Sequence, residues 1–162
     1  MYQLYELKEL IIKLEYYKEK YIAEVKDFST LTESEINIDI LSEKLISIPQ
    51  KTYMKNLSLI NQLEETQELQ KQKTIIEDNT LSEVNRLEDL KNQAQRDAKL
   101  RMLLLDNEQY QAIEKILLQL QKTKLLINAQ ITSYEASLSG IKYRYKQMCN
   151  LLDNDKKLQE AI

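Results

Sequence analysis

The sequence is poor in the residues that break helices and in those that carry catalysis. Among its 162 residues there are one Gly, one Pro, one Cys, no His and no Trp. Gly and Pro normally supply the turns between short elements, so a chain with one of each predicts a few long helices joined by few loops. The same shortage argues against a β-rich or an α/β fold.

The missing residue types also remove most active-site chemistry. Without His the chain has neither the usual general base nor the commonest metal ligand, and the single Cys149 can form neither an intramolecular disulfide nor a thiolate metal site. Gly140 alone cannot build a glycine-rich phosphate loop. Carboxylate pairs such as Glu64 and Glu68 are better explained as a solvated helix face than as a metal or acid–base site. We therefore expect no enzyme, no cofactor, no metal ion and no small-molecule substrate.

Long apolar runs are absent as well. No segment of about 18 apolar residues occurs, and the first residues lack a basic region followed by an apolar core. These features predict a cytoplasmic protein without a membrane partner. The composition, 43% apolar and 30% charged with a net charge of −3, is typical of helix bundles and coiled coils.

The C-terminal third carries the strongest pattern, which we call the C-terminal stripe. Its positions alternate in steps of three and four, and all but Lys124 are apolar. They are Tyr110, Ile113, Leu117, Leu120, Lys124, Ile127, Ile131, Tyr134, Leu138, Ile141, Tyr145, Met148 and Leu152. The spacing predicts a coiled-coil helix over residues 107–155, with Asp106 and Gln109 as a capping box.

This stripe also predicts self-association, because so long an apolar face is buried only against other helices. The residues expected in the interface of a homo-oligomer are Ile113, Leu117, Leu120, Ile127, Ile131, Leu138 and Ile141. The number of copies does not follow from the sequence.

A second pattern, the N-terminal stripe, opens the chain. It runs through Leu4, Leu7, Ile11, Leu14, Lys18, Tyr21, Val25 and Phe28. It predicts a helix over residues 1–28 that pairs with the C-terminal stripe, within one chain or between chains. The expected fold is thus all-α, a single oligomeric domain of long helices in an antiparallel coiled coil or helical hairpin.

The middle of the chain predicts further helices with breaks between them. Thr32 and Glu35 suggest the cap of a short element over residues 32–48, and Pro49 predicts a break before middle helices over 50–105. The spacing of three and four that starts at Tyr53 falls on polar residues through 64–73. This pattern predicts a solvated segment or one that binds a polar partner. A kink is expected at 78–80, followed by a narrow stripe through 87–105 whose alanines would let another helix approach closely.

Two basic groups are the candidate nucleic-acid contacts. Lys71 and Lys73 lie in the polar middle segment, and the second group mixes cations with an aromatic ring: Lys142, Tyr143, Arg144 and Lys146. Cations and aromatic rings together supply phosphate contacts and base stacking in single-strand-binding sites. The alternative for Lys71 and Lys73 is a solvated helix face, and the alternative for the second group is the ordinary flank of a coiled coil.

Four segments resemble the recombination-mediator proteins of T4-like phages. They are Ile38-Asp39-Ile40-Leu41-Ser42-Glu43-Lys44-Leu45-Ile46-Ser47-Ile48-Pro49, Tyr53-Met54-Lys55, Leu69-Gln70-Lys71-Gln72-Lys73 and Leu138-Ser139-Gly140-Ile141-Lys142-Tyr143-Arg144. The family has an acidic N-terminal helix, an Ile-Asp start, an apolar-Pro junction and a Lys-x-basic motif in its middle helix. The resemblance would cover roughly residues 30–150.

The resemblance implies a helical homo-oligomer in the host cytoplasm that binds single-stranded DNA and recruits a recombinase to strands covered by a single-strand-binding protein. It assigns the DNA-contacting motif to Lys71 and Lys73. The chain departs from the family in having Ile75-Ile76-Glu77-Asp78 where a Tyr-Tyr-x-Gly usually follows, and in its net acidity. The alternative is a structural or adaptor coiled coil that binds only proteins, including a phage-encoded inhibitor of a host complex.

Overall fold

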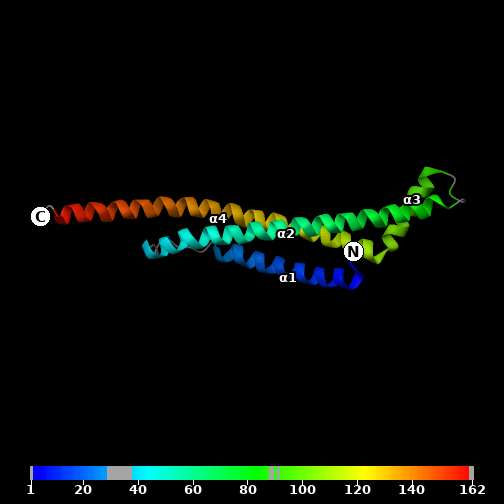
Figure 1. Cartoon of the computed structure of the whole chain (residues 1–162), viewed down its shortest axis with the longest axis horizontal. Helices are drawn as coiled ribbons and strands as arrows, with labels where there is room; N and C mark the ends of the chain where they lie inside the picture. Colours follow the sequence, from blue (N-terminus) through cyan, green and yellow to red (C-terminus); the bar gives the residue numbers. More distant parts are fainter. Residues whose placement is uncertain (1, 29–37, 88–89, 91, 161–162) are drawn as a thin grey trace. The chain divides into compact units, whose positions relative to one another are not determined.

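The described part of the chain is almost entirely helical, which confirms the predicted all-α class. The computed structural model describes residues 2–28, 38–87, 90 and 92–160, with side chains described outside 24–28 and 157–160. It contains α1 (Leu4–Phe28), α2 (Ile38–Asn85), α3 (Gln93–Asp106) and α4 (Glu108–Glu160) (Figure 1). The predicted cap at Thr32 and Glu35 lies outside the described residues. Within these ranges, none of the helices is both long and apolar enough to cross a lipid bilayer.

The helices build two compact units, which share the three long helices. Unit 1 comprises Met1–Lys20 and Ile60–Leu125, and unit 2 comprises Tyr21–Leu59 and Leu126–Ile162. Each unit contains one part of α1, one of α2 and one of α4.

Helix α1 begins with a local cap. The backbone N–H of Gln3 donates to the Glu6 carboxylate at 2.6 Å, and the backbone N–H of Leu7 donates to the Gln3 carbonyl at 3.1 Å. Glu6 also places negative charge in the first turn, where the helix dipole favours it.

Helix α2 continues through both predicted interruptions. Pro49 lies inside the helix and is exposed, so water can solvate the Leu45 carbonyl that a proline nitrogen cannot bond. At the expected kink, the hydroxyl groups of Thr80 and Ser82 donate to the carbonyls of Ile76 and Asp78, at 2.7 and 2.8 Å. These residues therefore form local hydrogen bonds without leaving the helix.

The breaks occur instead around α3, and asparagines cap the helices that follow them. Asn92 Oδ1 accepts from the Gln95 backbone N–H at 2.9 Å at the start of α3, and Asn107 Oδ1 accepts from the Tyr110 N–H at 3.0 Å at the start of α4. The predicted cap at Asp106 is thus wrong by one residue. Gln109 donates to the Tyr2 carbonyl at 2.8 Å rather than completing a capping box.

In unit 1, segments of α1, α2 and α4 pack around one apolar core. Its buried members are Leu7, Leu14, Leu69, Ile113, Ile116 and Leu120. Lys8 of α1 contacts Glu108 of α4, and Glu15 of α1 contacts Gln119 of α4. Residue numbers increase in the same direction on both helices, so α1 and α4 run parallel. Helix α2 runs antiparallel to both. Burial of each such Leu or Ile contributes about 1.5–3 kcal/mol, so the two terminal stripes stabilise one another within a single chain.

The polar stretch of α2 is part of this packing, contrary to the prediction of a solvated segment. Leu69 is fully buried and Gln72 almost so. The Gln72 side chain accepts from the Tyr2 backbone N–H and donates to the Tyr2 carbonyl, both at 2.8 Å. A polar residue is tolerated there because both of its polar atoms have partners.

In unit 2, Tyr21 of α1 joins α2 to α4. Its hydroxyl lies 3.4 Å from Ser58 Oγ, its ring lies 4.1 Å beneath Lys55 Nζ, and its carbonyl accepts from Gln130 Nε2 at 3.0 Å. The buried apolar residues of this unit are Tyr21, Leu41, Ile48, Ile127 and Tyr134.

Buried residues recur at multiples of seven on all three long helices. On α4 these are Ile113, Leu120, Ile127 and Tyr134, as the C-terminal stripe predicts. Between them the predicted positions are wrong by one residue. The buried residues there are Ile116, Thr123 and Gln130. By contrast, Leu117 and Ile131 are half-buried and Lys124 is exposed.

Helix α3 differs from the others in having no buried residue. The alanines at 94 and 98, expected to admit a neighbouring helix, are exposed. Within the described chain, no helix packs closely enough on α3 to bury any of its side chains.

Candidate functional site

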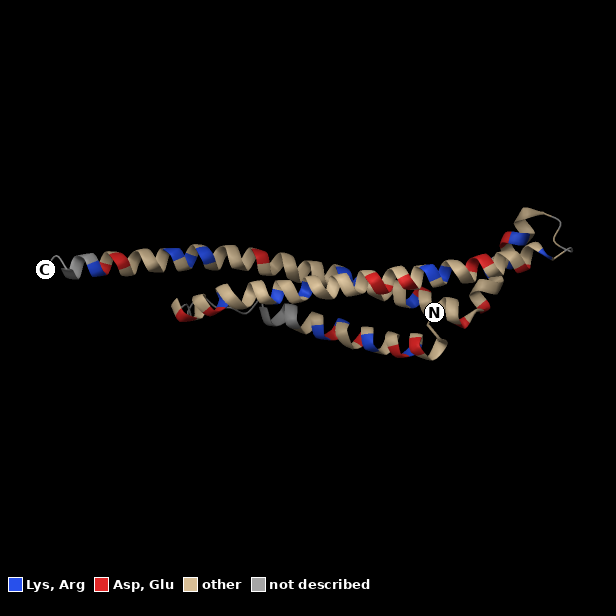
Figure 2. Cartoon of the chain, in the orientation of Figure 1, with Lys and Arg blue, Asp and Glu red and all other residues tan. Residues whose placement is uncertain are grey.

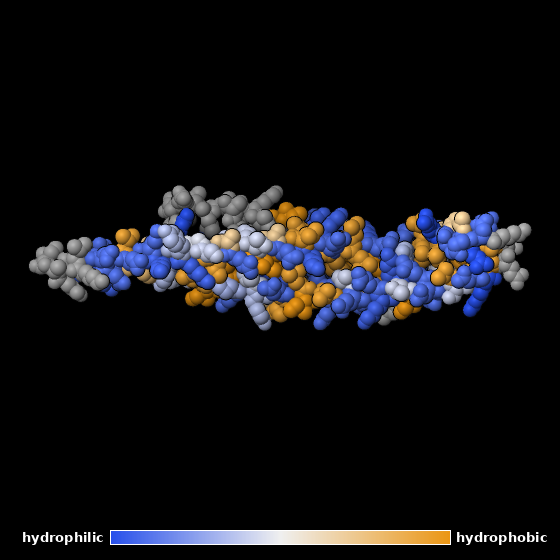
Figure 3. Space-filling model, turned by 90° about the horizontal axis from the view of Figure 1, so that it is seen from above, coloured by the Kyte–Doolittle hydropathy of each residue, from blue (hydrophilic) through white to orange (hydrophobic). Residues whose placement is uncertain are grey.

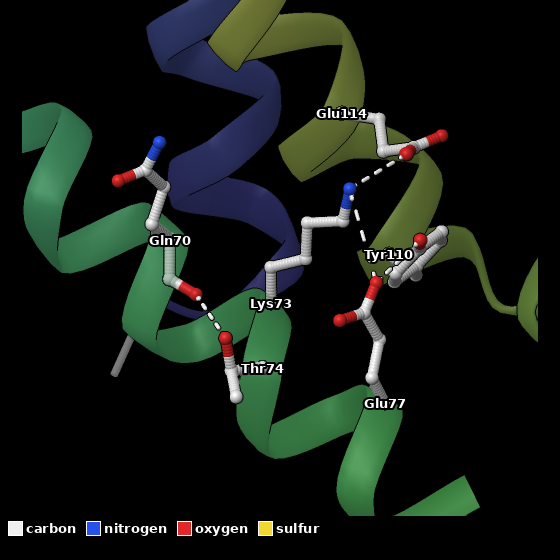
Figure 4. A network of polar contacts seen from close by, with 6 residues as sticks. All are labelled: Gln70, Lys73, Thr74, Glu77, Tyr110 and Glu114. Atoms are coloured by element: carbon white, nitrogen blue, oxygen red, sulfur yellow. Dashed lines mark hydrogen bonds and ion pairs between the residues drawn. The ribbon is translucent and has the colours of Figure 1, made fainter. Parts of the chain in front are cut away.

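Lys73, one of the two predicted DNA-contacting lysines, is held in a polar cluster within unit 1. Its ammonium group lies 2.8 Å from Glu114 Oε1 on α4 and 3.8 Å from Glu77 Oε1 on α2. It also lies 5.2 Å from the centre of the Tyr110 ring, and the Tyr110 hydroxyl donates to Glu77 at 2.8 Å (Figure 4). Two carboxylates and an aromatic ring therefore surround this cation.

The electrostatics of the cluster fix its protonation. The hydrogen bond to Glu114 raises the pKa of Lys73, although partial burial works in the opposite direction. Burial raises the pKa of Tyr110, and its hydrogen bond to Glu77 adds to that effect. Near neutral pH the lysine is charged and the phenol is neutral. The two carboxylates offset the charge of Lys73, and the contacts link α2 to α4, which is a structural role.

Lys71 lies two residues earlier on α2 and is exposed. Residues two apart on a helix point about 200° away from each other, so the turn that directs Lys73 toward α4 directs Lys71 away from it. The structure therefore does not bring the two lysines together on one open surface.

The second basic group lies on α4 in unit 2. Lys142, Tyr143, Arg144 and Lys146 are all exposed, and the segment is marked by blue turns of α4 in Figure 2. The Tyr143 hydroxyl accepts from Gln147 Nε2 at 3.0 Å. The neighbouring Tyr145 is half-buried. Cations and one ring thus reach solvent together, as the sequence pattern suggested.

The residues expected in an oligomer interface are packed within the chain itself. Ile113, Leu120 and Ile127 are essentially inaccessible to solvent. The half-buried remainder comprises Leu117, Ile131, Leu138 and Ile141. Three of the seven predicted interface residues are therefore buried within the chain, and the other four keep part of their surface accessible.

Large apolar side chains are exposed on all four helices, including the outer sides of α1 and α2. Figure 3 shows apolar atoms reaching one surface of the molecule between hydrophilic side chains. On α1 the exposed apolar residues of unit 1 are Tyr5, Ile12 and Tyr16, which we call the α1 outer face. In the unit 2 part of α2, the exposed apolar residues after Pro49 are Tyr53, Met54 and Leu57. Ile46 is also exposed, one turn before Pro49.

The sequence pattern alone did not identify these outer faces, because the register through Tyr53 and Leu57 looked like an inner stripe. A competing signal was present in Leu41, Ile48 and Leu69, which are separated by multiples of seven. Those three are buried in the structure, together with Gln72 and Val84 of the same helix. The polar residues between them, such as Thr52 and Gln62, concealed that register.

No group of three or more Cys, Asp or Glu side chains is arranged to hold a metal ion in the described part of the chain. A scan against protein-family models finds no match, and neither curated proteins nor solved structures include a significant one.

Proposed function

We propose that this protein is a non-enzymatic helical adaptor that binds other proteins through the α1 outer face. The observation that carries the proposal is the exposure of Tyr5, Ile12 and Tyr16, each more than 60% accessible, on a helix whose other side is closed by α2 and α4. Exposed apolar groups aligned in this way are typical of interaction sites.

The geometry of α1 places these three side chains on one side of the helix. Steps of seven and four residues return to nearly the same direction. Exposed Glu9 and Glu19 lie on the same side, one turn from Ile12 and Tyr16, and exposed Lys8 and Lys20 flank it at similar spacing. Aromatic rings supply large contact area at low entropic cost, and charges of both signs at the edge favour a partner with an apolar centre and a mixed polar rim.

Site-specific photo-crosslinking tests the adaptor function. A benzoylphenylalanine placed at Ile12 should capture a defined protein in cells of the source organism, and the same probe at exposed Leu125 should not. The purified partner should then bind the wild type at least about tenfold more tightly than Ile12→Glu. Absence of a specific adduct at Ile12, or equal affinity of the two proteins, would contradict the proposal.

Single-stranded DNA binding of the recombination-mediator type is the second candidate. It is favoured by the joint exposure of Lys142, Tyr143 and Lys146, the pattern that backbone contact and base stacking require. The placement of Lys73 does not favour it, because two carboxylates of the chain already contact that lysine.

A fluorescence-anisotropy titration with labelled single-stranded DNA separates the two functions. At about 50 mM salt, DNA binding through phosphates should be strong and should weaken steeply as salt rises. Lys142→Ala with Lys146→Ala should weaken it further, whereas Lys73→Ala should act only through stability. The adaptor function predicts no salt-dependent signal; its appearance would put the mediator function in first place.

A further inference from the structure

The main chain of Tyr2 is held by two glutamine side chains from the helices that pack against α1. Gln72 of α2, only 1% exposed, accepts from the Tyr2 backbone N–H through Oε1 and donates to the Tyr2 carbonyl through Nε2, both at 2.8 Å. Gln109 of α4 donates to the same carbonyl, also at 2.8 Å. Three hydrogen bonds therefore join one residue to two other helices, and we call this arrangement the Tyr2 latch.

The latch lies where the main chain can take part in it. Tyr2 precedes α1, which begins at Leu4, so its N–H is outside the hydrogen-bond ladder of the helix. Inside a helix each N–H is already bonded to the carbonyl four residues before it, so it could not also donate to Gln72. Directly after Tyr2, the Gln3 N–H donates to the Glu6 carboxylate and the chain turns into α1.

The ion pairs that join α1 to α4 are, by contrast, exposed. In the pair of Lys8 with Glu108 the side chains are 64% and 75% exposed, and in the pair of Glu15 with Lys115 they are 58% and 56% exposed. Exposed ion pairs contribute little, whereas a buried amide that loses its hydrogen-bond partners is strongly unfavourable. The latch is therefore a stronger polar tie of α1 than these ion pairs.

Helices α2 and α4 have polar ties of their own in unit 1. The Lys73 ammonium group lies 2.8 Å from Glu114, and the Tyr110 hydroxyl donates to Glu77 at 2.8 Å (Figure 4). Neither contact involves α1. The pair formed by α2 and α4 can thus stay linked when α1 leaves it.

We propose that the Tyr2 latch holds the unit 1 part of α1, residues 4–20, as a single element that opens from α2 and α4 while these two remain paired. Opening uncovers Leu7 and Leu14, which are buried, so the open state is a minor one whose population the latch sets. Once detached, this segment loses its helix, because isolated helices of about 12–15 residues are marginal in water. Opening therefore also removes the α1 outer face as an ordered surface, a consequence for partner binding that rests on the proposed function.

Hydrogen exchange of the full chain, followed by mass spectrometry in low concentrations of guanidinium, tests whether α1 opens alone. In the wild type the amides of residues 8–14 should exchange at least about tenfold faster than those of residues 113–120, and with a weaker dependence on denaturant. Equal rates and equal denaturant dependence in the two segments would overturn the proposal, because α1 would then open only when all of unit 1 unfolds.

A pair of matched glutamine variants tests the latch itself. Methionine resembles glutamine in length and helix propensity but has no N–H donor and only a weak acceptor. Gln72→Met should therefore speed exchange in residues 8–14 by about tenfold or more. Gln67→Met makes the same change at an exposed position of α2 and should leave the rate unchanged. Gln109→Met, which removes one of the three hydrogen bonds, should give a smaller increase than Gln72→Met.

Equal exchange in the Gln72→Met and Gln67→Met proteins would overturn the latch. Neither measurement uses a partner protein, so failure of the latch is distinguishable from failure of the adaptor function.

Discussion

At the scale of single residues, Lys71 and Lys73 show how two neighbours with the same chemistry acquire different roles. Both are lysines in a polar stretch, and the sequence offers no reason to separate them. Folding places one against Glu114 and the Tyr110 ring and leaves the other in solvent. The difference comes from the helix that packs against α2 at that point.

The first prediction compares the two lysines. Lys73→Ala should lower the free energy of unfolding by about 1 kcal/mol through loss of a partly buried ion pair, and Lys71→Ala should leave it nearly unchanged. Chemical denaturation measures both. In a double-mutant cycle with Glu114→Ala, a coupling of about 0.2–1 kcal/mol is expected. A coupling of zero would show that the ion pair contributes nothing.

The second prediction concerns Glu65 and pH. Burial raises the pKa of this carboxyl above its ordinary value of 4.5, although Lys13 opposes the change. The native state then holds more protons than the unfolded state as pH rises from 4.5, so this group makes stability fall as pH rises through its folded pKa. Its destabilising effect is complete at neutral pH and absent in acid.

Glu65→Gln should therefore unfold at a higher temperature than the wild type at pH 7, and the difference should shrink as the pH falls from 7 toward 4.5 and be nearly absent below it. Thermal melts followed by circular dichroism across this range provide the measurement. Glu64→Gln, at the exposed neighbouring position, is the matched control. A gap between wild type and Glu65→Gln that stays constant from pH 7 to pH 4 would rule out this role for Glu65.

At the scale of elements, Pro49 is the clearest case of tertiary structure overriding local preference. A proline inside a helix removes one backbone hydrogen bond and costs about 3 kcal/mol relative to alanine. Helix α2 nevertheless continues through it, with Leu41 and Ile48 buried on one side and Pro49 exposed on the other. Burial of Leu41 and Ile48 before the proline, and the contacts of Lys55 and Ser58 with Tyr21 after it, maintain the helix.

The third prediction follows from that continuity. Pro49→Ala should restore a hydrogen bond to the Leu45 carbonyl and stabilise the protein by about 1–3 kcal/mol, with a slight gain in helicity. Denaturation at one fixed protein concentration measures the change, and Gln50→Ala serves as control. If Pro49→Ala is neutral or destabilising, α2 is not a continuous helix at this residue.

The sequence predicted the elements better than the registers. The N-terminal stripe identified Leu7, Leu14 and Tyr21, and the C-terminal stripe identified every seventh buried residue from Ile113 to Tyr134. Between those positions, two neighbouring residues can each satisfy the spacing of three and four. The prediction chose Ile131 over Gln130 because Ile131 is apolar. Gln130 is buried because its side chain donates to the Tyr21 carbonyl, a contact between residues 109 apart that no local pattern contains.

The candidate sites were predicted less well than the fold for the same reason. The exposed basic residues near Tyr143 could be recognised from composition alone. Whether Lys73 is available, or which side of α2 is apolar and exposed, depends on the rotation of α2 toward α1 and α4. That rotation is decided by Leu41, Ile48 and Leu69 together, at separations larger than the windows in which periodicity is usually judged.

At the scale of the whole molecule, the central claim is that the two terminal stripes close on each other within one chain. Leu7 and Leu14 of α1 share a core with Ile113, Ile116 and Leu120 of α4. Because these inner faces are buried within the chain, the proposed partner surface is the α1 outer face.

The fourth prediction, which tests this claim most directly, is a cross-linking measurement between α1 and α4. Lys8 Nζ and Glu108 Oε2 lie 3.8 Å apart, and both side chains are largely exposed, so cysteines at these positions should leave the core intact. In a Cys149→Ser background, Lys8→Cys with Glu108→Cys should react with a short bismaleimide to give a cross-linked monomer. Its yield should not depend on protein concentration. Cross-linked dimers whose share grows with concentration would show that the stripes pair between chains, and would contradict the account.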